Sequence, residues 1–214
     1  IFACPIIRYC LGLFILALCN IVRMIILPSK ERLIEKHFLE YSFSDDDTKP
    51  NFDVFKKLNS FDQYYLASIF NWDDGIEVLN WIIDSPKCDS GTACMIFWQA
   101  EPDYYADHTI DTIDEINKDV FELLQKIVER FKTNGFKWNL LKFDLLDNGY
   151  DTTTISSKHD IWELPEKLKN GTKGFVPISL NGIRGMIWMY QRNRRLKKRE
   201  KRKAARQKKL HNNQ

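Results

Sequence analysis

Hydrophobic positions along the chain recur mostly at helical spacing. The clearest stretch runs from Thr112 to Gly135, where an apolar residue returns every three or four positions. Thr112 and Glu115 have the spacing of a capping box, and Gly135 is a residue type at which helices commonly end. This pattern predicts one long amphipathic helix.

The same spacing predicts four shorter helices, over residues 31–43, 61–70, 76–84 and 90–100. We expect Asn59 or Ser60 to cap the second of them, Pro86 to close the third and Asp89 to cap the fourth. Residues 136–146 can supply one or two short strands, and residues 165–168 a helical turn. The pattern therefore predicts a mainly α fold: a small multi-helix domain with one or two short strands.

The first part of the chain is apolar. Residues 9–27 number nineteen and carry one charge, Arg23, close enough to their end to reach a membrane interface. We expect a transmembrane-like helix that stops at Pro28, with the basic residues after it facing the cytoplasm. A buried core helix is the alternative. A cleaved signal peptide fits less well, because no small-residue cleavage site follows the run.

Charge divides the chain into three parts. The net charge of +3 combines +3 in residues 1–30, −11 in residues 31–191 and +11 in residues 192–214. Aromatic residues stand just before the basic tail, as in segments that lie at the lipid headgroup level. The residues expected to contact anionic lipid are Trp188, Tyr190, Arg192, Arg194, Arg195, Lys197, Lys198 and Arg199.

These patterns predict four segments. They are a membrane anchor at 1–30, a helix and acidic linker at 31–58, a helical core domain at 59–180, and an interfacial aromatic segment with a basic, helical or disordered tail at 181–214. Five cysteines without a regular framework suit a reducing compartment.

A set of short motifs lies within the predicted core domain. They are Asn71-Trp72-Asp73-Asp74-Gly75, Trp81-Ile82, Cys88-Asp89, Gly91-Thr92-Ala93 and Phe97-Trp98. Between about Phe61 and Phe143 the chain thereby resembles a bacterial family known only as a domain of unknown function (number 4274). The resemblance implies a small bacterial domain without an assigned activity, and it brings no catalytic residues to this chain.

The motif residues have structural interpretations. Asp73 and Asp74 precede a predicted helix, where carboxylates accept backbone N–H groups, so we expect capping rather than acid–base chemistry or metal binding. We expect Trp72 and Trp81 to pack at the core or its rim. Cys88 and Cys94 lack zinc-site spacing and a neighbouring His. The sequence thus predicts no enzyme, cofactor or metal site.

The sequence leaves several functions open. The first hypothesis is a membrane-associated, non-catalytic binding module, single-pass or peripheral, whose acidic body docks a protein partner. An immunity-type inhibitor of a toxin is a narrower form of it, because an acidic surface complements a basic cleft. For the basic tail, membrane lipid is the first expected ligand, and non-specific binding of nucleic acid is the second.

Overall fold

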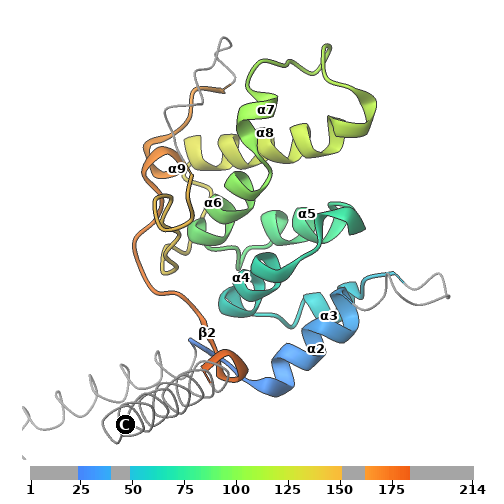
Figure 1. Ribbon diagram of the computed structural model, residues 1–214, viewed down its shortest axis with the longest axis vertical. Helices are drawn as coiled ribbons and strands as arrows, with labels where there is room; N and C mark the ends of the chain where they lie inside the picture. The colour runs from blue at the N-terminus through green and yellow to red at the C-terminus, as the bar shows by residue number, and fades with distance from the viewer. Residues whose placement is uncertain (1–23, 40–48, 151–161, 184–214) are drawn as a thin grey trace, which may run out of the picture. The chain divides into compact units, whose positions relative to one another are not determined.

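The computed structural model of the chain describes residues 24–39, 49–150 and 162–183. Across these residues the fold is mainly helical, as predicted (Figure 1). The elements are β1 Ile25–Ile26, α2 Pro28–Phe38, α3 Phe52–Phe55, α4 Ser60–Ile69, η2 Trp72–Asp74, α5 Glu77–Asp84, α6 Ser90–Gln99, α7 Pro102–Tyr105, η3 Glu115–Asn117, α8 Lys118–Lys132, α9 Glu166–Asn170 and β2 Ile178–Ser179. The chain divides into two compact units, residues 1–177 and 178–214.

Helix α6 forms the centre of the first unit. It contacts α4, α7 and α8, and Figure 1 shows it between α4 and α8. Every residue from Ser90 to Trp98 is buried. The sequence predicted a helix with one apolar face, but neighbours on several sides cover α6, so small and apolar residues are needed all round it.

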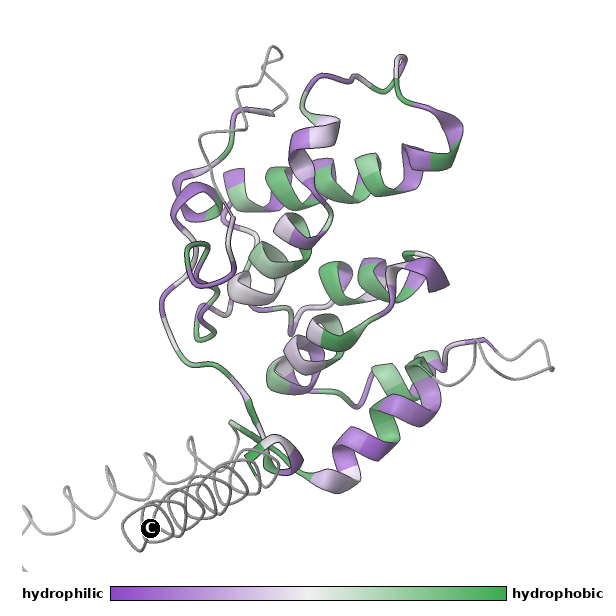
Figure 2. Cartoon of the chain, viewed as in Figure 1, coloured by the Kyte–Doolittle hydropathy of each residue, from purple (hydrophilic) through white to green (hydrophobic). Residues whose placement is uncertain are grey.

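Helix α8 is amphipathic, as its spacing predicted. Figure 2 shows hydrophobic and hydrophilic residues alternating along it, and its buried residues include Leu124 and Ile127. Helix α5 buries Val78, Leu79, Ile82 and Ile83 in the same way. The side chains of α2, α4, α5, α6 and α8 therefore share one hydrophobic core.

The ends of α8 differ from the prediction. The Thr112–Glu115 capping box is wrong: Thr112 Oγ1 accepts from the N–H of Thr109 at 2.8 Å in a turn of its own, and α8 starts later, at Lys118. At the other end, the positive φ of 51° belongs to Asn134, and Gly135 donates its N–H to Arg130 O at 2.8 Å. The left-handed residue that ends the helix is thus an asparagine.

Helix α4 begins with the cap that the sequence indicated. Asn59 Oδ1 accepts from the N–H groups of Phe61 and Asp62 at 2.8 and 2.9 Å, and Asp62 Oδ2 accepts from the Asn59 N–H at 3.0 Å. This reciprocal pair is a complete capping box. It satisfies backbone donors that the first turn of a helix otherwise leaves unpaired.

The strands predicted within residues 136–146 are single bridges. Trp138 pairs with Asp89, Leu141 with Phe175 and Phe143 with Thr172. Gly174 makes this approach possible, since a Cβ there would lie 2.1 Å from Leu140 O. The predicted helical turn at 165–168 is present as α9, one residue later.

The beginning of the described chain corrects the expected end of the apolar helix. Ile25–Ile26 form β1, and Pro28 is in the first turn of α2 instead of stopping a helix. Proline fits this position because its fixed φ suits a helix and its missing N–H has no partner to lose. Across the described residues, no helix is long and apolar enough to cross a membrane. Residues 1–23, which hold most of the predicted anchor, lie outside the described residues.

The capping box of α4 gives a stability prediction. Replacing Asn59 by Ala should lower the free energy of unfolding by about 1 kcal/mol, because two N–H groups lose their acceptor. Asn117→Ala is the matched control, since Asn117 stands at the N-cap of α8 without a side-chain cap. Urea denaturation of both variants measures the difference, and equal losses would contradict the assigned role of Asn59.

Candidate functional site

The segment from Cys88 to Ala93 joins α6 to a distant part of the chain. Asp89 is fully buried and caps α6, as predicted, by accepting from the Gly91 N–H at 2.8 Å. The same carboxylate accepts from the N–H groups of Leu140 and Leu141 at 2.7 and 3.2 Å. Three hydrogen bonds from backbone donors engage both oxygens, so this carboxylate has a structural role.

Gly91 and Thr92 lie at the start of α6, where the chain comes close to residues 140 and 141. A Cβ on Gly91 would lie 2.3 Å from Leu141 O, so only glycine fits here. Thr92 is fully buried, and Ser90 donates its hydroxyl to Asn139 Oδ1 at 2.7 Å. The glycine and the serine are therefore explained by the packing of residues 139–141 against the first turn of α6.

The two cysteines of the core domain are buried and free. Burial raises the pKa of Cys88 to about 12, although Arg130 opposes the shift, and burial alone raises the pKa of Cys94 to about 12. Both thiols are therefore protonated at neutral pH, and a thiol is a weak nucleophile and a poor metal ligand. Cys4, Cys10 and Cys19 lie outside the described residues.

The corner from Asn71 to Gly75 is an exposed turn between α4 and α5. Asn71 caps η2 by accepting from the Asp73 N–H at 3.3 Å, and Gly75 has a φ of +84°. Ile76 stands at the N-cap of α5 and makes no side-chain hydrogen bond, so neither Asp73 nor Asp74 occupies the cap position of that helix. The glycine lets the chain reverse before α5 begins, and the carboxylates belong to η2.

The two motif tryptophans pack where the sequence placed them. Trp72 is partly buried against the hydrophobic core. Trp81, on α5, lies against two rings of α3, with ring centroids 4.8 Å from Phe52 and 5.7 Å from Phe55. Helix α3 was not predicted, so this aromatic cluster was missed from the sequence.

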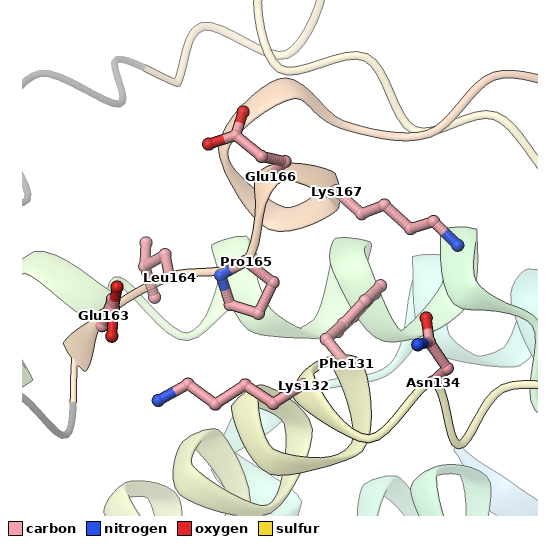
Figure 3. Close-up of a pocket in the computed structure, with 8 residues that line it drawn as sticks. All are labelled: Phe131, Lys132, Asn134, Glu163, Leu164, Pro165, Glu166 and Lys167. Atoms are coloured by element: carbon pink, nitrogen blue, oxygen red, sulfur yellow. The ribbon is translucent and has the colours of Figure 1, made fainter.

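Two polar hollows lie near α9. One, of about 510 Å³, is lined by Phe131, Lys132, Asn134 and residues 163–167 (Figure 3). Figure 3 shows the ammonium groups of Lys132 and Lys167 pointing in opposite directions, so the charges do not converge on one position. The other, of about 680 Å³, lies between residues 144–150 and residues 169–170. Neither arrangement selects a ligand.

Carboxylates crowd the connection from α7 to α8. We call residues 101–122 the acidic segment: it carries eight carboxylates, all exposed, and one lysine, Lys118. Exposed hydrophobic side chains stand among them, and Tyr104, Ile110 and Ile116 are 47%, 46% and 92% exposed. The sequence showed an acidic body but did not localise this concentration.

Other predicted groups are dispersed or undescribed. His37 lies on α2, and the His108 ring lies 5.6 Å from the Tyr104 ring. In the described ranges, no three His, Cys, Asp or Glu residues group so that they could hold a metal ion. The predicted lipid-contact residues 188–199, with His159 and His211, lie outside the described residues.

Comparison with known proteins adds one finding. Residues 62–132 match the model of a protein family described as a domain of unknown function (DUF4274). The match covers about a third of the chain, and it confirms the resemblance seen in the motifs within a somewhat narrower range. No curated protein and no solved structure matches the chain.

The matched stretch contains α5, α6, α7, α8 and all of α4 except its first two residues, and therefore most of the first unit's core. It holds Asp89 but ends before Leu140 and Leu141, which donate to that carboxylate. It also holds the acidic segment, Gln63 and Trp81, whereas Phe52 and Phe55 precede it. The matched stretch thus includes the central helices, whereas α2, α3 and α9 lie outside it.

The contacts of Asp89 give a second stability prediction. Asp89→Asn should lower the free energy of unfolding by about 1–3 kcal/mol, because the amide NH₂ faces a buried N–H and leaves it unpaired. Asp73→Asn, at the exposed corner, is the matched control and should change stability by less than about 0.5 kcal/mol. Chemical denaturation measures both, and an unchanged Asp89→Asn protein would rule out the proposed role.

The buried thiols give a reactivity prediction. In a chain carrying Cys4→Ser, Cys10→Ser and Cys19→Ser, Cys88 and Cys94 should react with a disulfide reagent at pH 8 far more slowly when folded than in urea. Because folding raises each thiol pKa from 9.0 to about 12, their contribution to stability is full below pH 9 and is lost as the pH rises through 12. Rapid labelling of the folded chain would contradict this assignment.

Proposed function

We propose that the chain is a non-catalytic binding module, held at a membrane, that docks a basic protein partner through the acidic segment. The observation that carries the docking proposal is the set of eight exposed carboxylates within residues 101–122, opposed by one lysine. A concentration of one sign of charge raises the association rate with a partner of the opposite sign and disfavours other partners.

The apolar residues of the acidic segment support a protein as the partner. Ile116 is 92% exposed, and Tyr104 and Ile110 are about half exposed. Protein interfaces combine such hydrophobic anchors with a polar rim, and a few of them provide most of the binding energy. If the acidic segment served only to interact with water, an exposed isoleucine at position 116 would contribute nothing to that role.

The fold holds both ends of the acidic segment in place. Pro102 and Tyr105 are buried at its beginning, and Phe121 is buried near its end. Between them the like charges repel one another, which costs stability without contributing to the core. A basic partner relieves this repulsion on binding, and so the arrangement suits a docking surface.

The non-catalytic part of the proposal rests on how the reactive groups of the family-matched stretch are used. The Asp89 carboxylate accepts three backbone N–H groups, and the thiols of Cys88 and Cys94 are protonated and buried. The carboxylate and the two thiols therefore take part in the packing of the core. To act in an active site, each of them would first have to leave these buried surroundings.

The membrane part of the proposal rests on sequence alone. Its support is the apolar run at residues 9–27 and the aromatic and basic residues from Trp188 onward. An anchor of this kind would raise the local concentration of the module near a partner at the membrane surface. Fractionation of cells that make the full chain tests it, because recovery only in the soluble pool would reject an anchor.

Within this proposal, an immunity-type inhibitor of a toxin is the narrower function that the acidic segment favours. A toxin that acts on nucleic acid needs a basic cleft, and a dense acidic surface with a hydrophobic anchor complements such a cleft. Nucleic-acid binding by the tail remains the second choice, and the acidic segment itself would repel phosphates.

Neutralising the acidic segment should remove partner binding. The test variant is Asp111→Asn, Asp114→Asn and Glu115→Gln, and its matched control is Asp73→Asn, Asp74→Asn and Glu77→Gln, which removes the same charge from η2 and the first residue of α5. Nuclease-treated pull-downs with the full chain, quantified by mass spectrometry, should retain a basic protein with wild type and control but lose it with the test variant.

The purified partner then provides a quantitative check. Its affinity should fall as salt rises, because exposed charges are screened. Ile116→Ser should weaken it at least tenfold without changing stability, since this side chain lies outside the core. Loss of binding in the Asp73, Asp74 and Glu77 control alone would transfer the interface to the corner, and unaltered binding in every variant would reject the acidic segment.

A further inference from the structure

An exposed apolar surface lies where residues 136–143 run beside residues 171–177. The N–H of Phe175 donates to Leu140 O at 2.8 Å, and Phe175 O accepts from the Lys142 N–H at 2.9 Å. Together with the bridge at residues 141 and 175, these hydrogen bonds hold the two stretches side by side. Residues that are distant in the sequence thereby form one surface.

Four large hydrophobic side chains of these stretches are about half exposed. Trp138 and Leu140 are 45% and 42% exposed, and Phe175 and Val176 are 53% and 50% exposed. Trp138 and Leu140 stand two residues apart in extended backbone, so their side chains lie on the same side, opposite the fully buried Leu141. Exposed hydrophobic side chains that gather in one place mark an interaction surface, whereas scattered ones do not.

Basic residues accompany this apolar surface, and carboxylates do not. The two stretches contain three lysines and no Asp or Glu. Lys142 is paired with Asp144 and Asp147, at 3.0 and 3.1 Å. Lys137 and Lys173 are exposed, and no ion pair between described residues involves either of them. We call the whole surface the lysine–aromatic face: Lys137, Trp138, Leu140, Lys173, Phe175 and Val176.

The residue types of the lysine–aromatic face fit an anionic lipid surface. Tryptophan is enriched at the headgroup level of membranes, because its ring is apolar and its N–H is polar. Lysine keeps its alkyl chain on apolar surface while its ammonium group reaches the headgroups, and an anionic bilayer attracts that charge. Protein interfaces, by contrast, are depleted of lysine. Aromatic rings beside free lysines therefore favour lipid over a protein partner.

The acidic segment lies away from the lysine–aromatic face. Figure 1 shows the connection between α7 and α8 at the upper right, and the orange stretch that follows α9 at the left. An anionic bilayer repels the carboxylates of residues 101–122 and attracts Lys137 and Lys173. Both effects favour one orientation of the first unit, in which the acidic segment points away from the lipid.

We propose that the lysine–aromatic face docks onto an anionic membrane surface. In the docked state the rings of Trp138 and Phe175 lie at the headgroup level, and Lys137 and Lys173 reach the lipid phosphates. The proposal rests on the membrane part of the proposed function, and it adds which face of the folded chain meets the lipid. The acidic segment stays free for its protein partner.

The tryptophans of the full-length chain report this orientation. In nanodiscs of phosphatidylcholine and phosphatidylserine, a nitroxide on the headgroup weakens the NMR signal of each ¹⁵N-labelled indole that lies near the lipid. The Trp138 signal, identified with Trp138→Phe, should lose about half of its intensity or more, because this ring lies at the headgroup level. Trp72 and Trp81, on η2 and α5, lie outside the face and should lose much less.

Removing the two free lysines tests the charged contribution. Lys137→Gln with Lys173→Gln should reduce the attenuation of the Trp138 signal about twofold or more, because the face loses its attraction for anionic lipid. Lys36→Gln with Lys57→Gln is the matched control. It removes the same charge from exposed positions outside the face, and it should leave the attenuation unchanged.

A second pair of substitutions tests the apolar contribution. Leu140→Ser with Val176→Ser should also reduce the attenuation of Trp138 about twofold or more, because these half-exposed side chains leave water on docking. Ile116→Ser, in the acidic segment, is the control and should leave it unchanged. Circular dichroism verifies folding, and the wild-type pattern decides the outcome where a variant does not fold.

Three results would overturn the proposal. They are equal attenuation of Trp138, Trp72 and Trp81, attenuation of Trp188 without that of Trp138, and a face that binds an acidic protein but not lipid. Recovery of the chain only outside the nanodiscs would reject the membrane part of the proposed function, and this face with it. Attenuation of Trp188 alone rejects only the face, so the two failures are distinguishable.

Discussion

The buried carboxylate of Asp89 is the interaction on which the first unit depends most directly. It is both a local cap, for the start of α6, and a long-range contact, for Leu140 and Leu141. Because α6 is covered on several sides, the chain after α8 must return across its first turn to complete the core. The carboxylate supplies the acceptors for that return, and Gly91 supplies the space. A buried charge without these donors would be strongly unfavourable, so the cap and the return stabilise each other.

The sequence predicted local devices well, because the residues that form them are close together in the chain. Asn59 and Asp89 were both expected to cap helices, and the periodicity of α5 and α8 located their buried faces. Prediction failed where a second local contact competes for the same group, or where the partner of a residue is distant in the chain. The Thr112–Glu115 spacing fits a capping box, yet a turn formed with Thr109 uses that hydroxyl first. The apolar residues in 136–146 suggested strands, but their partners are single residues elsewhere, so only isolated bridges form.

The candidate sites were visible in the sequence to different degrees. An acidic body follows from counting charges, and the density within residues 101–122 could have been found by counting in a shorter window. The aromatic cluster around Trp81 could not, because it combines Phe52 and Phe55 of α3 with a residue of α5. No spacing rule connects these positions.

The reactive groups at the centre of the described core are buried and serve its packing. At pH 7 a thiol with a pKa of about 12 is protonated, and both core cysteines are of this kind. Burial of these two thiols removes them from water, which disfavours the thiolate and so keeps the thiols unreactive. The carboxylates of residues 101–122 and the side chain of Ile116 are, by contrast, exposed to solvent. They lie outside the contacts that hold α6 in place, so a change to them leaves the buried hydrogen bonds of Asp89 intact.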